Sequence, residues 1–127
     1  MFSHIMVGSN DIARAKTFYD AIFAELGAKA GVFDPKGRLI YVHDRALFMV
    51  TKPIDGAPAT VANGGTIGFR MSDAAQVDRW HAAGVAHGGV SIEDPPGVRH
   101  GGPRPLYLAY LRDPDGNKLC GVHYVKA

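Results

Sequence analysis

The chain repeats one pattern twice, and this internal repeat constrains its fold more than any other feature of the sequence. Residues 3–21 align with residues 65–83 at an offset of 62, and the aligned positions share apolar or acidic character. The matched pairs are Ile5 with Ile67, Val7 with Phe69, Asp11 with Asp73, Ala15 with Val77, and Phe18 with Trp80. Each match alone is weak, but their order is consistent, so we predict two copies of one supersecondary unit.

The later parts of the two copies also align. LIYVHD at residues 39–44 matches LAYLRD at residues 108–113. After a longer turn in the second copy, FMV at residues 48–50 matches LCG at residues 119–121. Each copy therefore has the order strand, helix and three further strands, which we write βαβββ.

Local sequence signals support this order of elements. Residues 2–8 read as a strand, and apolar residues at helical spacing follow the capping residue Asp11. Asp73, with Gln76 three residues later, predicts the start of a second helix. Residues 88–105 carry four prolines among glycines, so we expect at most an edge strand within a long irregular loop.

We predict an α+β fold in which two βαβββ modules form a curved mixed sheet around a central cleft. The chain of 127 residues is long enough for one domain with a real core. Module one is expected at residues 1–52 and module two at residues 65–127. The linker at residues 53–64 shows no periodicity and is rich in proline and glycine.

Composition narrows the class of protein. A chain that is 46% hydrophobic and 20% charged is typical of a globular domain. Its 14 basic and 12 acidic residues are too balanced to indicate nucleic-acid binding. One cysteine cannot form an internal disulfide, and no apolar run is long enough to span a membrane. We therefore expect a cytoplasmic, soluble protein without nucleic-acid or membrane partners.

Strand alternation separates a helix-covered face from an open face in each module. The helix-covered face would hold alternate apolar residues, such as Phe48 and Leu119. The open face would hold their neighbours: His4, Met6, Met49, Thr66, Gly68 and Cys120. Two modules side by side would enclose a cleft between their open faces, which is a natural ligand site.

Four further residues are candidates for this cleft. If Ile40, Val42, Ala109 and Leu111 face the helices, alternation directs their neighbours into the cleft. These neighbours are Tyr41, His43, Tyr110 and Arg112. Aromatic walls with one or two cations would suit a small organic acid or an aromatic compound. Alternatively, His43 and Arg112 are solvated charges at strand ends.

Two stretches resemble a known family: FYDAIF at residues 18–23 and DPDGNKLCGVH at residues 113–123. Together with the first strand, they are similar to the vicinal oxygen chelate superfamily, which contains glyoxalases, bleomycin-resistance proteins and extradiol dioxygenases. The resemblance covers essentially the whole chain and extends to a glyoxalase-like bacterial subgroup of unsettled activity. It implies paired βαβββ modules, often in a homodimer, with a divalent metal in the cleft.

The resemblance also implies four metal-ligand positions, which fall on His4, Met49, Thr66 and Cys120. Of these, His4 alone keeps the residue type of the family. Glyoxalases have glutamate at the positions of Met49 and Cys120, and His or Gln is usual at that of Thr66. A thioether and a neutral hydroxyl are poor ligands for hard divalent ions. Glyoxalase chemistry also needs a carboxylate base, and neither glutamate position is filled.

We therefore expect a protein that binds a small organic molecule, with the metal centre lost or remodelled and no cofactor. The predicted contact residues are His4, Tyr41, His43, Met49, Thr66, Tyr110, Arg112 and Cys120. The alternative is a metal-dependent lyase or dioxygenase that uses His4 with a non-standard ligand, such as a residue of the 88–105 loop or of a partner chain. An interaction module without a ligand is a third hypothesis.

Two features also have simple structural interpretations. Cys120 is more often a small buried apolar residue than a nucleophile. Asp113, Asp115 and Asn117 resemble an acidic metal loop, but turn formation explains them better because the spacing of a calcium loop is incomplete.

Overall fold

The structure of the chain, a computed structural model, describes residues 1–126 and contains two βαβββ units. The first unit consists of β1 (His4–Gly8), α1 (Ile12–Ala24), β2 (Val32–Phe33), β3 (Leu39–His43) and β4 (Ala46–Thr51). The second consists of β5 (Ile67–Arg70), α2 (Ala74–Ala86), β6 (Val90–Arg99), β7 (Leu106–Arg112) and β8 (Lys118–Tyr124). The predicted α+β repeat is confirmed.

Each unit forms its own four-stranded mixed sheet, and the two sheets have equivalent strand orders. The orders are β1-β4-β3-β2 and β5-β8-β7-β6. The first strand of each unit pairs in parallel with the last strand, and the other neighbours are antiparallel. Two parallel strands must be joined by a long crossover connection, which is usually a helix. This explains why a helix follows the first strand in each unit.

The two helices begin at the predicted caps. Asp11 accepts a hydrogen bond from the Arg14 amide at 3.0 Å, and Asp73 accepts one from the Gln76 amide at 2.7 Å. Gln76 in turn accepts a hydrogen bond from the Ser72 amide. These bonds satisfy amide groups that the first helical turn leaves without partners.

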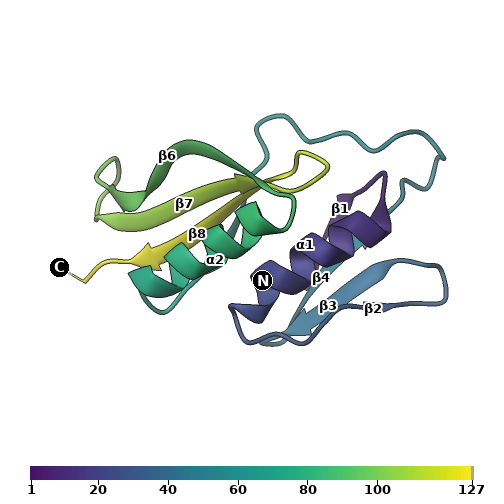
Figure 1. The fold of residues 1–127 in the computed structure, drawn as a ribbon, viewed down its shortest axis with the longest axis horizontal. Helices are drawn as coiled ribbons and strands as arrows, with labels where there is room; N and C mark the ends of the chain where they lie inside the picture. Colours follow the sequence, from purple (N-terminus) through teal and green to yellow (C-terminus); the bar gives the residue numbers. More distant parts are fainter. Residues whose placement is uncertain (127) are drawn as a thin grey trace.

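The core lies between the helices and the sheets. Figure 1 shows α1 and α2 side by side, each in front of its own sheet. Aromatic rings from both units meet there, with the rings of Phe23 and Phe69 5.3 Å apart and those of Phe69 and Trp80 6.3 Å apart. The two units therefore share one apolar core through their helix-covered faces.

β6 is an edge strand, as predicted, but it is longer and more regular than its four-proline neighbourhood indicated. It pairs with β7 on both sides of a large bulge, because Ile92 lies opposite Tyr110 and Gly97 lies opposite Leu108. Pro95 and Pro96 fall within the bulge, where a missing amide hydrogen breaks no ladder bond. The edge position and the bulge are the places where a strand tolerates proline.

The connection between β4 and β5 has no helix or strand within the described residues. Figure 1 shows it as a long excursion along one side of both units. Across residues 1–126, no helix has the length and apolar character needed to cross a membrane.

Candidate functional site

The open face of the second sheet carries a polar cluster around Cys120. The strand register places Cys120 between Gly68 of β5 and Tyr110 of β7. Two residues closer to the hairpin turn, and on the same face, Lys118 lies opposite Arg112. Tyr110, Cys120 and Arg112 are therefore on the face that the sequence predicted for them.

Lys118 connects this cluster to a carboxylate of the edge strand. Its ammonium nitrogen lies 4.8 Å from the centre of the Tyr110 ring and 2.5 Å from a carboxylate oxygen of Glu93. A cation over an aromatic ring is attracted by the negative face of the ring. The contacts thus run from Glu93 on β6 through Lys118 on β8 to Tyr110 on β7.

Glu93 has an unusual backbone conformation, with a φ of +59°. It begins the bulge of β6, in which residues 93–96 have no partners in the ladder with β7. Arg99 stabilises this bulge by donating hydrogen bonds to the carbonyl oxygens of Gly97, Asp94 and Pro95. Left-handed backbone is costly for a residue with a side chain and tends to mark functional positions.

Neither Glu93 nor Lys118 is among the contact residues predicted from the sequence. The Pro95-Pro96 pair was a usable signal for a bulge, but nothing in the order of residues indicated that Glu93 reaches Lys118. That contact depends on which residues of β6 are unpaired with β7, and on how the bulge orients their side chains.

The environment of Cys120 keeps its thiol protonated. The residue is 4% exposed, and this burial raises the pKa of the thiol to about 11, although neighbouring Tyr110 opposes the shift. Burial likewise raises the pKa of the Tyr110 hydroxyl, and Cys120 and Glu93 contribute to that increase. Cys120 therefore offers a polarisable, neutral surface at neutral pH rather than a thiolate.

A polar cavity of about 470 Å³ adjoins this cluster. It lies between the end of the 52–66 connection and the β7–β8 hairpin. Thr66, Arg112 and Lys118 line it together with Asn63, Gly64 and Gly65. The structure thus brings two predicted contact residues, Thr66 and Arg112, into one cavity.

The first sheet holds the other family positions. Met49 of β4 lies opposite Met6 of β1 and is 7% exposed, whereas His4 lies opposite Leu47 and is exposed. His4 shares a hydrogen bond of 2.8 Å between its Nδ1 and the Ser3 hydroxyl. Both residues are on the open face, as alternation predicted, but neither lines the polar cavity.

The predicted orientation of Tyr41 and His43 is wrong. Tyr41 is 3% exposed within the core, and its hydroxyl donates a hydrogen bond of 2.6 Å to Asp20 on α1. Burial and this carboxylate both raise the pKa of Tyr41. His43 lines a separate apolar cavity of about 130 Å³ with Tyr41, Phe23 and Phe48. Both tyrosine and histidine are thus on the helix-covered side of β3.

A one-residue shift in register explains this error. Tyr41 lies opposite Phe48, whereas Tyr110 lies opposite Cys120. The residue that occupies the place of Tyr41 in the second unit is therefore Leu111, which lies opposite Leu119. A shift of one residue exchanges the faces of every side chain in a strand.

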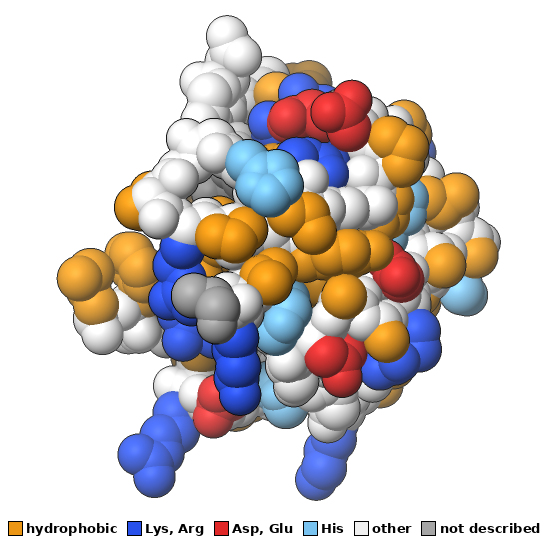
Figure 2. Space-filling model, turned by 90° about the vertical axis from the view of Figure 1, so that its left-hand side faces the viewer, with side chains coloured by type: hydrophobic (Ala, Val, Ile, Leu, Met, Phe, Trp, Pro, Cys, Tyr) orange, Lys and Arg blue, Asp and Glu red, His pale blue; other side chains and the backbone are white. Residues whose placement is uncertain are grey.

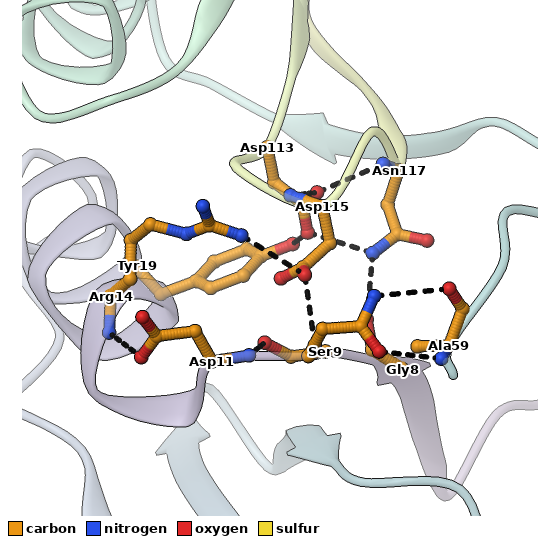
Figure 3. Close-up of polar contacts among 10 residues, drawn as sticks. Gly8, Ser9, Asp11, Arg14, Tyr19, Ala59, Asp113, Asp115 and Asn117 are labelled. Atoms are coloured by element: carbon orange, nitrogen blue, oxygen red, sulfur yellow. Dashed lines mark hydrogen bonds and ion pairs between the residues drawn. The ribbon is translucent and has the colours of Figure 1, made fainter. Parts of the chain in front are cut away.

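The Asp113–Asn117 turn is a structural clamp, and the prediction that turn formation explains its acidic residues is confirmed. Asp113 is buried and accepts hydrogen bonds from the amides of Asp115 and Asn117 and from the Tyr19 hydroxyl. Asn117 donates to its carboxylate and to the Gly8 carbonyl. Figure 3 shows this network between the hairpin turn and the α1 end of the first unit.

A second set of contacts extends the clamp. One carboxylate oxygen of Asp115 accepts from the Asn10 amide at 2.9 Å and from the Arg14 guanidinium at 3.3 Å. Asn10 also exchanges two hydrogen bonds with the backbone of Ala59 in the long connection. Three segments that are distant in sequence are thereby joined at one point (Figure 3).

The residues at the four family positions do not fit a divalent metal within one chain. Among residues 1–126, no group of three or more His, Cys, Asp and Glu side chains is arranged to hold an ion. Met49 offers a soft thioether, Thr66 a neutral hydroxyl and Cys120 a buried thiol. A zinc site needs about three ligands drawn from histidine nitrogen, carboxylate oxygen and cysteine thiolate, and of these four residues at most His4 and Cys120 could supply one.

Comparison with known proteins agrees with the fold. The sequence pattern of the Glyoxalase/Bleomycin resistance protein/Dioxygenase superfamily matches residues 1–120. The chain therefore belongs to this superfamily, and its predicted membership is confirmed. Among curated proteins, none matches the chain.

Solved structures show how widely this fold is shared. A glyoxalase/bleomycin resistance protein from Albidiferax ferrireducens T118 is similar at 51% identity and a TM-score of 0.93, covering 97% of this chain and 98% of that one. Lactoylglutathione lyase from Agrobacterium tumefaciens has 22% identity and a TM-score of 0.68, covering 97% and 92% of the respective chains. The latter likeness is evidence of the fold alone.

Proposed function

We propose that the chain binds a small organic molecule against the open face of its second sheet. One observation carries this proposal: Tyr110, Cys120 and Lys118 form a partly aromatic, partly charged surface beside a polar cavity. A few convergent polar groups around a concave site are typical of small-molecule sites. Thr66 and Arg112 at the cavity would orient the ligand through a hydroxyl and a guanidinium.

A second copy of the chain would complete the site. His4 and Met49 lie on the open face of the other sheet, and exposed apolar residues such as Val42 share that face. Figure 2, from the side of the C-terminus and β6, shows exposed hydrophobic side chains next to lysine and arginine. We infer a homodimer in which the first sheet of one protomer covers the second sheet of its partner.

In this proposal the inherited metal centre has been replaced by an organic binding surface. The neutral Cys120 thiol and the Met49 thioether would serve as polarisable walls against the ligand. No cofactor is needed for binding of this kind.

A specific observation favours one catalytic alternative, a lyase or dioxygenase. Glu93 supplies a carboxylate near Cys120, close enough to influence the pKa of that thiol. It belongs to the stretch 88–105, which the sequence suggests as a source of a non-standard metal ligand. In this alternative, Glu93 and His4 of a partner protomer would replace the usual residues.

Binding of single-ring compounds tests the proposal. We expect benzoate or its uncharged analogue benzamide to shift the amide resonances of β7 and β8 in NMR titrations. Tyr110→Ala should abolish these shifts, because it removes the ring from the surface. Phe33→Ala, which removes an exposed ring from the first sheet, is the matched control and should leave them unchanged. Shifts that persist in Tyr110→Ala would contradict this site.

A further inference from the structure

Two basic side chains face the polar cavity from neighbouring strands. Arg112 and Lys118 are cross-strand partners at the base of the β7–β8 hairpin, and both line the cavity. Directly opposed positions in an antiparallel pair bring side chains within about 5 Å at their Cβ atoms. Like charges held this close repel each other unless an anion lies between or beside them.

The other lining groups leave this part of the cavity positive. Asp115 is the one acidic residue of the described chain that lines it. Its Oδ1 accepts from the Arg14 guanidinium, which offsets its charge, and from the Asn10 amide, whereas its Oδ2 is buried with no partner among the described residues. Arg112 donates one hydrogen bond to the Gly116 carbonyl at 2.7 Å, out of the five N–H groups of a guanidinium. Thr66 and Asn63 add a hydroxyl and an amide to the lining.

Glu93 balances the charge of Lys118 from outside the cavity. It lies on the bulge of β6 and is not among the residues that line the cavity. Its carboxylate is 47% exposed, so the ion pair is accessible to solvent and to competing anions. The left-handed backbone at Glu93 shows that the bulge holds this side chain at some conformational cost.

We propose that the ligand is an organic anion whose charged group lies between Arg112 and Lys118 and displaces Glu93 as the partner of Lys118. The inference rests on the proposed function and specifies the chemical class of the ligand. A carboxylate or a phosphate monoester would form charge-assisted hydrogen bonds with both cations. An attached ring would lie toward Tyr110, over which the Lys118 ammonium already sits.

Titration with matched ring compounds tests the ligand class. Benzoate and phenyl phosphate carry different anionic groups on the same ring, and benzamide carries that ring without a charge. Comparing the three compounds separates the effect of charge from that of the ring, and it distinguishes a carboxylate from a phosphate. We expect the tighter of the two anions to bind about tenfold more tightly than benzamide, because a hydrogen bond to a charged group is stronger than a neutral one. Raising the salt concentration should weaken only the anions.

Variants of the ion pair test the proposed exchange of partners. Lys118→Met should weaken binding of the tighter anion about tenfold and leave benzamide unchanged, whereas Lys118→Arg should keep the preference for the anion. Glu93→Gln should tighten binding of the anion by about threefold, because the competing carboxylate is gone. Lys36→Met, at an exposed turn of the first unit, is the matched control for loss of a positive charge.

The outcomes separate this inference from the function on which it rests. If benzamide binds the open face as tightly as both anions, or if Glu93→Gln weakens binding of the anion, the anion site is wrong but small-molecule binding stands. If none of the three compounds shifts the resonances of β7 and β8, both proposals fail.

Discussion

At the scale of single residues, Asp113 joins the two units through a buried hydrogen bond. Its buried carboxylate accepts from the Tyr19 hydroxyl at 2.6 Å, and Tyr19 is fully buried in the first unit. Burial and this carboxylate both raise the pKa of Tyr19, so the phenol stays protonated and remains a donor. The hydrogen bond is therefore insensitive to pH across the neutral range.

Removal of the Asp113 carboxylate should destabilise the whole protein. Asp113→Ala leaves the buried Tyr19 hydroxyl and the turn amides without an acceptor, so we expect a loss of about 3 kcal/mol in the free energy of unfolding. Urea denaturation followed by circular dichroism measures it. Asp94→Ala, at an exposed position of the β6 bulge, should change stability little. Equal effects of the two variants would contradict the clamp.

The Cys120 thiol should react slowly and with an unusual pH dependence. Burial raises its pKa to about 11, so the thiolate fraction in the folded protein increases only as the pH approaches that value. In the chain unfolded in urea, the rate of alkylation by iodoacetamide should level off as the pH increases. In the folded protein, the rate should continue to increase above that pH. Rapid alkylation of the folded protein at neutral pH would instead indicate an activated nucleophile.

Single residues also show the limit of sequence reasoning about the site. Alternation correctly assigned His4, Met49, Tyr110 and Cys120 to open faces. It failed for Tyr41 because the two units differ by one residue in the register of their hairpins. Such a shift leaves no trace in the hydrophobic pattern, since tyrosine suits a core as well as a cleft.

At the scale of elements, the helices and most strands were predictable because their signals are local. Caps at Asp11 and Asp73 and apolar residues at helical spacing marked both helices. Pro95 and Pro96 could have indicated a bulge in β6, but its extent was not predictable, because it depends on pairing with β7 rather than on the sequence of β6 alone. Glu93 and its contact with Lys118 were missed for the same reason.

The packing of α2 against its sheet depends on a glycine in the helix. A Cβ atom at Gly84 would lie 2.4 Å from Leu111 Cδ1 and 3.3 Å from atoms of Ile22 and Phe18. Gly84→Ala should therefore destabilise the protein by about 2 kcal/mol through overpacking, despite the better helix propensity of alanine.

Thermal unfolding of a matched pair of variants checks this expectation. Gly101→Ala adds a methyl group where nothing lies within 4 Å and should leave the midpoint unchanged. A midpoint for Gly84→Ala equal to or above that of the parent chain would show that α2 can move away from β7.

At the scale of the whole molecule, the two units are joined through their helices and the turn clamp, which leaves both open faces exposed. Apolar residues on these faces include Val42, which is 64% exposed, and Val90, which is 59% exposed. Exposed apolar surface of this kind is typical of a protein interface. This arrangement is the basis for the proposed dimer.

Sedimentation should report a dimer, with twice the chain mass of 13.6 kDa. Val42→Glu places a charge on the open face of β3 and should shift the protein toward monomer, because an unpaired charge in an apolar interface is costly. Val85→Glu, at an exposed position of α2, should remain dimeric. A Val42→Glu protein that stays dimeric would contradict the open face as the interface.

The claim that an organic binding surface has replaced the metal centre is tested most directly by metal analysis. Protein purified without an affinity tag would be assayed by mass spectrometry for zinc, nickel, iron and manganese, beside His4→Ala and the control His100→Ala. We predict far less than one equivalent of metal per chain in all three proteins. One equivalent that is lost in His4→Ala and retained in His100→Ala would contradict the account and favour the metal-dependent lyase or dioxygenase.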